Sequence, residues 1–193
     1  RVSAYLMIPL PESSAEEAAV KTLPAVLCLQ QTTDTGKDET AGIRGDADMK
    51  YAMELAERGF VTLAPDYPSF GEHAYDFSPV HGYASGSMKA VWDNIRGVDF
   101  LQALPEVDGE RIGCIGHSLG GHNAIFTGVF EPRFKAIVSS CGFSSLQEDD
   151  VASWSGPRYM PRMASQFGND AKQVPFDFHE LIAALAPRPF LAV

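Results

Sequence analysis

The stretch RIGCIGHSLGGHNAIF, residues 111–126, decides the fold. It opens with a short apolar run, passes through GHSLG at residues 116–120, and continues with small and apolar residues that favour a helix. This is the pattern G-x-S-x-G between a strand and a helix, the arrangement of a nucleophile elbow. A chain that turns directly from strand to helix strains its tip residue, and only glycine neighbours allow so close a passage. The pattern therefore predicts that Ser118 is a nucleophile exposed above the end of a strand.

The residues around Ser118 favour this interpretation over two others. The backbone N–H of Leu119 would lie at the helix N-terminus, unpaired by the helix itself, where an oxyanion could form. A phosphate-binding loop is excluded, because Ser118 stands where the second glycine of G-x-G-x-x-G is required and no G-K-[ST] follows. His117 and His122 flank the serine, but neighbours on a sharp turn project away from it, so neither is expected to be its base.

The rest of the chain alternates short apolar runs with helical periodicity, as βαβ units around a parallel sheet do. We predict six strands, at residues 3–8, 25–29, 60–64, 111–116, 135–140 and 189–193. Most are continuous Val, Ile, Leu and Ala runs, which is typical of strands covered on both faces. Only the first has the character of an edge strand.

Two helices have clear boundaries. Asp46 can cap a helix whose apolar residues recur at i, i+3, i+4 and i+7, and Gly59 can end it. A longer helix is expected over residues 87–104, with one apolar stripe facing the sheet: Met88, Val91, Trp92, Ile95, Val98 and Leu101. A tight turn at residues 108–109 is expected to lead into the strand that precedes Ser118.

Two irregular stretches interrupt the alternation. Residues 66–83 carry several aromatic side chains, Tyr67 and Phe70 among them, which could line an apolar pocket or pin the loop in place. Residues 144–175 are interpreted as a cap or lid inserted before the last strand.

Composition narrows the class of protein. A chain of 193 residues with 45% hydrophobic residues suits one domain, over residues 1–193. A formal charge of −10 repels phosphate backbones, so no nucleic-acid partner is expected. No window reaches the roughly 18 unbroken apolar residues of a membrane helix, so no membrane partner is expected either. Three widely separated cysteines predict no disulfide scaffold.

At this point the chain resembles the α/β-hydrolase superfamily and, within it, the dienelactone hydrolase and acetyl xylan esterase-like carboxylesterases. The resemblance is carried by LPAVLCLQQTTDTGKDE, GFVTLAPDYPSFGE, VDGERIGCIGHSLGGHNA and LAPRPFLAV, in that order. It implies an α/β-hydrolase fold, with a mainly parallel, doubly wound sheet and an inserted cap. A second oxyanion donor is implied in the loop after residues 25–29, and we favour the backbone N–H of Thr32 over that of Gln31.

The resemblance also implies a triad order of serine, then acid, then histidine. It places the acid just after the strand at residues 189–193 and the histidine after one further strand. Both are therefore expected beyond Val193, and the C-terminal part of the fold is interpreted as missing. His179 is the only histidine late in the chain that could substitute for the missing catalytic histidine. Asp177 can cap a short helix there, which favours a structural role for His179.

Other candidate groups have weaker support. Asp66 follows a strand directly and is interpreted as a turn residue. Arg158, Arg162 and Arg188 could hold an acidic substrate group, although isolated arginines more often form local ion pairs. No motif for a metal or cofactor is present, and none is expected.

The sequence thus predicts a serine hydrolase that acts on a small-molecule or carbohydrate ester. Ser118 would form the acyl-enzyme, and the N–H groups of Leu119 and Thr32 would hold the oxyanion. Two alternatives remain: a serine peptidase of the prolyl oligopeptidase type, and a non-catalytic hydrolase-like binding module.

Overall fold

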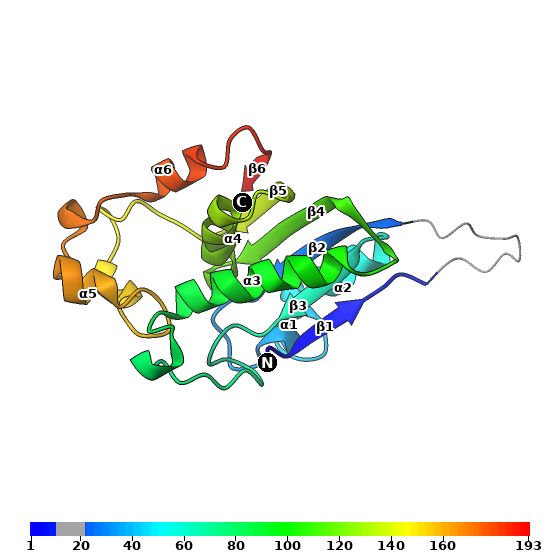
Figure 1. The fold of residues 1–193 in the computed structure, drawn as a ribbon, viewed down its shortest axis with the longest axis horizontal. Coiled ribbons are helices and arrows are strands. Elements are labelled where there is room, and N and C mark those ends of the chain that lie inside the picture. Colours follow the sequence, from blue (N-terminus) through cyan, green and yellow to red (C-terminus); the bar gives the residue numbers. More distant parts are fainter. Residues whose placement is uncertain (11–21) are drawn as a thin grey trace, which may run out of the picture.

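A single sheet of six strands forms the centre of the structure (Figure 1), a computed structural model that describes residues 1–10 and 22–193. The strands are β1 (Ala4–Met7), β2 (Leu23–Leu29), β3 (Val61–Pro65), β4 (Val107–His117), β5 (Phe134–Ser140) and β6 (Phe190–Ala192). Their order is β1-β3-β2-β4-β5-β6, and only β1 runs antiparallel to its neighbour. All six predicted strands are confirmed, and so is the mainly parallel sheet.

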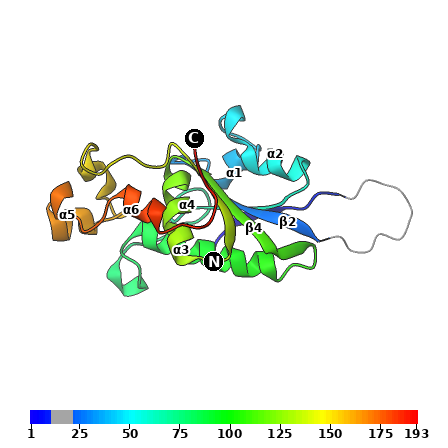
Figure 2. The ribbon, with the colours of Figure 1, turned by 90° about the horizontal axis from the view of Figure 1, so that it is seen from above.

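Helices cover both faces of this sheet. They are α1 (Lys37–Thr40), α2 (Tyr51–Glu57), α3 (Gly86–Gln102), α4 (Leu119–Phe130), α5 (Arg162–Phe167) and α6 (Phe178–Ala183), with short 3-10 turns η1 (Ala47–Met49), η2 (Pro79–His81), η3 (Val151–Trp154) and η4 (Ala171–Gln173). Helices α3 and α4 lie on one face and α2 on the other, while α5 and α6 lie beyond one end of the sheet (Figure 2). None of the helices in the described part of the chain is both long and apolar enough to cross a membrane.

The two predicted helices are present, but the start of α2 and the buried face of α3 differ from the prediction. Asp46 caps η1 rather than α2, and α2 ends before Gly59, which adopts a φ of 92°. In α3, Val91 and Val98 are buried against the sheet, but Met88 and Trp92 are exposed, contrary to the predicted stripe. The buried face is narrower than predicted because the sheet contacts only one side of α3.

The predicted turn at residues 108–109 is wrong, since β4 already begins at Val107. Leu23 extends β2 backward and pairs with Val107, so the sheet hydrogen bonding starts earlier than the sequence suggested. The turn lies before this pair, where the N–H of Val107 donates to the carbonyl of Leu104 at 3.1 Å.

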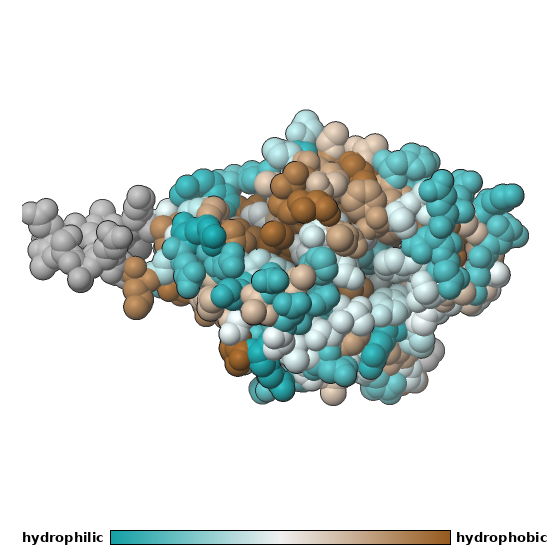
Figure 3. Space-filling view, turned by 180° about the vertical axis from the view of Figure 1, so that it is seen from behind, coloured by the Kyte–Doolittle hydropathy of each residue, from teal (hydrophilic) through white to brown (hydrophobic). Residues whose placement is uncertain are grey.

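The core lies between the sheet and its helices and is most complete around the central strands. Leu27 of β2, Ile112 of β4 and Phe134 of β5 are fully buried there. Toward β6 the packing thins, because Leu191 is 56% exposed. Apolar side chains also reach the surface on the face opposite to that of Figure 1 (Figure 3). The three cysteines are free thiols.

Residues 144–175 form a second apolar cluster beside α4. Leu146, Val151 and Met163 are buried together with Ile125 of α4 and Phe178 of α6. The segment therefore packs on the helix that follows Ser118, and its role as a cap over a substrate stays a prediction.

The position of Leu27 leads to a test of the core. Leu27→Ala should lower the free energy of unfolding by about 2–5 kcal/mol, because it removes a fully buried side chain from a packed interior. Urea unfolding measures this value. Leu191→Ala makes the same chemical change at an exposed position and should cost far less; equal losses in the two variants would contradict the described packing.

Candidate active site

Ser118 stands at the junction between β4 and α4, in a strained conformation. Its backbone has a φ of 51° and a ψ of −115°, a region that side-chain-bearing residues rarely adopt. The strain is held by two hydrogen bonds: Ser118 N–H donates to the Ser140 carbonyl at 2.8 Å, and the Ser118 carbonyl accepts from His122 N–H at 2.9 Å. The side chain is partly exposed. The geometry is that of the predicted strand–turn–helix elbow.

Glycines allow the elbow to pack directly on neighbouring backbone. A Cβ atom on Gly120 would lie 1.9 Å from the carbonyl oxygen of Leu29, and one on Gly116 would lie 2.2 Å from the carbonyl of Gly120. At Gly121 it would meet the Ser139 hydroxyl at 2.8 Å, so this residue is also a packing glycine. These contacts bring the first turn of α4 against the end of β2, where the predicted oxyanion loop begins.

The two backbone N–H groups that are predicted to hold an oxyanion are both unpaired among the described residues. Within the part of the chain that the structure describes, neither Leu119 N–H nor Thr32 N–H donates a hydrogen bond. Leu119 is the first residue of α4, and Thr32 lies in the exposed part of the loop after β2. The Gln31 side chain is turned to Glu39, to which it donates at 2.9 Å. The choice of Thr32 over Gln31 stays a prediction, because the N–H of Gln31 is unpaired there as well.

Neither His117 nor His122 forms a hydrogen bond with the Ser118 hydroxyl in the described structure, and the expectation that neither is its base stays a prediction. His117 Nδ1 lies 2.9 Å from the Ser140 hydroxyl. His122 is fully buried and stacks on Trp154, with ring centroids 4.7 Å apart and an angle of 16° between the planes. Burial lowers the pKa of His122 to about 3, so the imidazole is neutral.

His179 occupies the first turn of α6 and is exposed. Asp177 caps this helix in a capping box with Glu180, which confirms the predicted cap. None of the described histidines therefore forms a hydrogen bond with the Ser118 hydroxyl.

The aromatic loop after β3 is pinned in place. The Tyr67 hydroxyl donates to the Arg158 carbonyl at 2.5 Å, and the Arg158 guanidinium lies 4.6 Å from the centre of the Phe70 ring. Both aromatic residues are buried in a cluster with Leu119, and burial raises the pKa of Tyr67. These contacts fit the pin interpretation, and a role of Tyr67 and Phe70 in lining a substrate pocket stays a prediction. Tyr159 is only partly buried, and its hydroxyl lies 3.4 Å from that of Thr32.

Backbone carbonyls join the cap segment to the start of α3. Tyr159 O accepts from the Ser85 hydroxyl at 2.7 Å and from Ser87 N–H at 3.2 Å, and Pro157 O accepts from Gly86 N–H at 2.8 Å. The segment is thus fixed beside Thr32.

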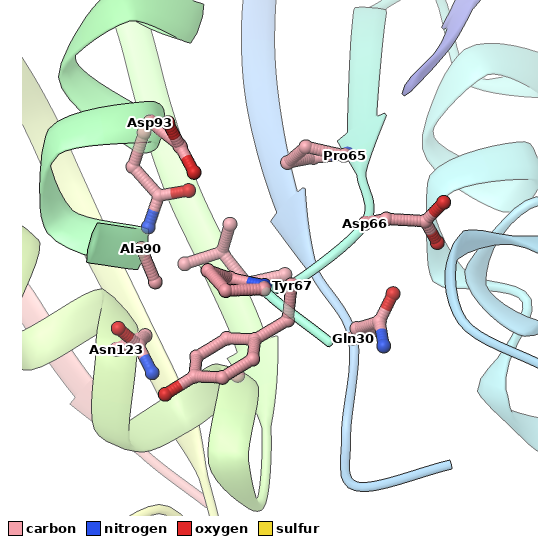
Figure 4. A pocket seen from close by; sticks show the side chains of 11 residues that line it. Gln30, Pro65, Asp66, Tyr67, Ala90, Asp93 and Asn123 are labelled. Carbon is pink, nitrogen blue, oxygen red and sulfur yellow. The ribbon is translucent and has the colours of Figure 1, made fainter. Parts of the chain in front are cut away.

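A cavity of about 10 Å³ lies behind the elbow (Figure 4). Tyr67 and Asn123 line it with side chains directed toward each other, whereas Asp66 points away from both. Asp66 instead meets Lys37 in a buried ion pair with a distance of 2.9 Å. Asp66 therefore has a buried partner that its interpretation as a turn residue did not include.

The environment of Lys37 keeps it charged. Burial lowers the pKa of Lys37, but hydrogen bonds with Glu72 and Asp66 outweigh this effect and raise the pKa above its ordinary value. Hydrogen bonds from Lys37 and Ser3 lower the pKa of Glu72.

The three late arginines are not held by local ion pairs, contrary to the sequence interpretation. Among the described side chains, no carboxylate pairs with Arg158, Arg162 or Arg188. Arg188 instead donates to the backbone carbonyls of Leu185 and Glu131, at 3.0 Å each.

The comparisons with known proteins agree with this geometry. The model of the prolyl oligopeptidase family, Peptidase_S9, matches residues 47–175, more than half of the chain. The chain belongs to the prolyl oligopeptidase family.

The relatives and structural neighbours of this chain include proteins named as hydrolases and esterases. The 2,6-dihydropseudooxynicotine hydrolase of Paenarthrobacter nicotinovorans is 31% identical over 57% of this chain and 29% of its own length. The glucuronoyl esterase from Solibacter usitatus shares the fold with a TM-score of 0.65 and 19% identity, over 99% of this chain and 58% of that protein. The acetyl xylan esterase from Paenibacillus sp. R4 also shares the fold, with a TM-score of 0.63 and 18% identity, over 100% of this chain and 72% of that protein. The predicted α/β-hydrolase resemblance is confirmed.

The chain is shorter than its relatives. It spans 35%, 54% and 29% of the length of three curated proteins that it matches.

The contact at Gly120 can be tested by adding one methyl group. Gly120→Ala should destabilise the protein, because the new Cβ would overlap the Leu29 carbonyl. Overpacking typically costs about 1–3 kcal/mol, which lowers the Tm of a domain of this size by roughly 2–12 °C. Gly156→Ala is the control, since its Cβ would meet nothing closer than 3.9 Å. Equal melting temperatures for the two variants would contradict the close approach.

The buried neutral His122 predicts a pH dependence of stability. The unfolded state takes up a proton near the ordinary pKa of 6.5, whereas the folded state does so only near 3. The stabilisation is therefore complete above pH 6.5 and is lost as the pH falls through this window. Between pH 7 and pH 5 the free energy of unfolding should fall by on the order of 2 kcal/mol more in the wild-type protein than in the His122→Phe variant. Urea unfolding at the two pH values measures the difference, and parallel losses would show that the imidazole is not buried in its neutral form.

Proposed function

We propose that the complete protein is a serine hydrolase that cleaves carboxylic esters through an acyl-enzyme on Ser118. The observation that carries the proposal is the strained Ser118 at the tip between β4 and α4. Strain of this kind costs on the order of 1–3 kcal/mol and is concentrated at functional sites, where it presents a reactive group. Relatives that are hydrolases and esterases by name support the same reaction class.

In the proposed reaction the Ser118 hydroxyl oxygen attacks the ester carbonyl carbon and passes its proton to a base. The carbonyl electron pair moves onto oxygen, and the tetrahedral intermediate then expels the alcohol, which takes up that proton. Water repeats the sequence on the acyl-enzyme, releases the acid and restores the serine.

The N–H groups of Leu119 and Thr32 would stabilise the oxyanion. Both are unpaired within the described structure, and the packing of Gly120 on the end of β2 brings their segments together. Donors of this kind act without reorganisation, and removal of one typically costs about 10²- to 10³-fold in kcat.

The general base and the acid would come from residues after β6, where the resemblance to α/β hydrolases implies them. The positions of His117 and His122 support this assignment, because both rings are engaged elsewhere. The proposed reaction requires no metal or cofactor.

The substrate would be a small-molecule or carbohydrate ester. Structural neighbours named as glucuronoyl and acetyl xylan esterases support a sugar-linked ester. The partly exposed Tyr159 beside Thr32 would contact the substrate near the oxyanion loop.

A serine peptidase is the second candidate, and the family match over residues 47–175 is the observation that favours it. Both candidates use the same elbow, so the substrate distinguishes them. Hydrolysis of a proline-containing p-nitroanilide, without turnover of p-nitrophenyl acetate, would select the peptidase.

Labelling with a fluorophosphonate tests the nucleophile in the protein as encoded at full length. Ser118 should be modified, and Ser118→Ala should lose both the label and the turnover of p-nitrophenyl acetate. The loss in kcat should be on the order of 10⁶-fold, as for removal of the serine in a serine protease. Peptide mass spectrometry locates the label.

Ser144→Ala is the matched control, because its hydroxyl only bonds Asp149 at 2.7 Å on the surface of the cap segment. It should keep both label and turnover. Undiminished labelling of Ser118→Ala would place the nucleophile elsewhere.

A further inference from the structure

A buried ion pair lies at the far end of the loop that carries Thr32. Lys37 Nζ meets Asp66 Oδ2 at 2.9 Å, and the two side chains are 2% and 0% exposed. The same carboxylate accepts from Lys37 N–H at 2.8 Å and from Glu72 N–H at 2.9 Å. One carboxylate thus joins the loop after β2 to the loop after β3.

The backbone is shaped to enclose this carboxylate. Gly36 and Gly71 adopt φ values of 59° and 54°, which side chains disfavour. A Cβ on either residue would lie within 2.3 Å of Asp66 Oδ1. The backbone of both loops therefore contacts the carboxylate directly, because no side chain stands between them.

The same loop is also fixed at its beginning. Gly120 packs against the carbonyl groups of Leu29 and Gln30, where β2 ends. Thr32 lies between this contact and Lys37. The N–H of Thr32 is therefore carried on a short span that is held at both ends.

Stability alone is a weak reason for such a pair. Burying two charges costs several kcal/mol per ion, and well-packed apolar residues of similar volume often stabilise a protein as well or better. A charged pair that also accepts hydrogen bonds from backbone N–H groups has one property that apolar packing lacks. It fixes the direction of the bonded groups as well as the distance between them.

We propose that the Lys37–Asp66 pair is a positioning device that sets the oxyanion N–H of the Thr32 loop without touching the substrate. The proposal rests on the proposed esterase function. It predicts that loss of the pair impairs transition-state stabilisation more than substrate binding.

Steady-state kinetics of the full-length protein with p-nitrophenyl acetate test the proposal. The double variant Lys37→Met/Asp66→Asn removes both charges together, so no uncompensated ion remains buried. Its kcat should fall about 10- to 1,000-fold, up to the loss of one oxyanion donor, while KM changes less than about twofold. Lys37→Arg keeps the charge and should retain more of kcat than Lys37→Met.

Arg133→Met is the matched control. Arg133 pairs with the buried Glu131 and, at 2.7 Å, with Asp99, beyond the end of α4 that lies opposite Ser118. This variant should lose stability, measured as Tm, but keep its kcat at temperatures where it is folded.

The outcomes separate the two proposals. An unchanged kcat in the double variant, or a kcat loss matched by Arg133→Met, would overturn the positioning role and leave the esterase assignment standing. Failure of the double variant to fold would also overturn it, since the pair would then serve the fold itself. A wild-type protein without label on Ser118 and without turnover would overturn the esterase proposal and the positioning role with it.

Discussion

The contact between the first turn of α4 and the end of β2 is the constraint on which the other features depend. It requires a glycine at position 120, because any side chain there would overlap the Leu29 carbonyl. It also requires the strained turn at Ser118, since a relaxed backbone would carry the helix away from the sheet. The placement of α4 on the sheet and the position of the loop after β2 beside Ser118 depend on this one close approach.

Most of the fold could be predicted because its signals are local. Strands covered on both faces are continuous apolar runs, and the buried strands β2 and β3 could be predicted for that reason. The errors arose where a distant partner decides the outcome. Pairing of Leu23 with Val107 extended β4 through a predicted turn, and partial coverage by the sheet left Trp92 exposed. Neither effect is written in the residues concerned.

The candidate site also has one part that could be predicted from the sequence and one part that could not. Ser118, Leu119 and the glycines form one continuous motif, so the elbow could be predicted from spacing alone. The partners of Asp66 and Tyr67 could not, because Lys37 lies 29 residues from Asp66 and Arg158 lies 91 residues from Tyr67. A carboxylate directly after a buried strand was the only available signal, and it does not name its counter-ion.

Backbone carbonyl oxygens are the acceptors in the hydrogen bonds that hold the cap segment, residues 144–175, to the start of α3. Pro157 and Tyr159 accept from the start of α3 through their carbonyl groups, and the Arg158 carbonyl accepts from the Tyr67 hydroxyl, so these hydrogen bonds do not use the three side chains. Substitution of the Arg158 or Tyr159 side chain would therefore leave these carbonyl anchors in place while altering the surface beside Thr32. If the proposed function holds, such an arrangement would let related genes differ in substrate preference while the geometry around Ser118 is inherited unchanged.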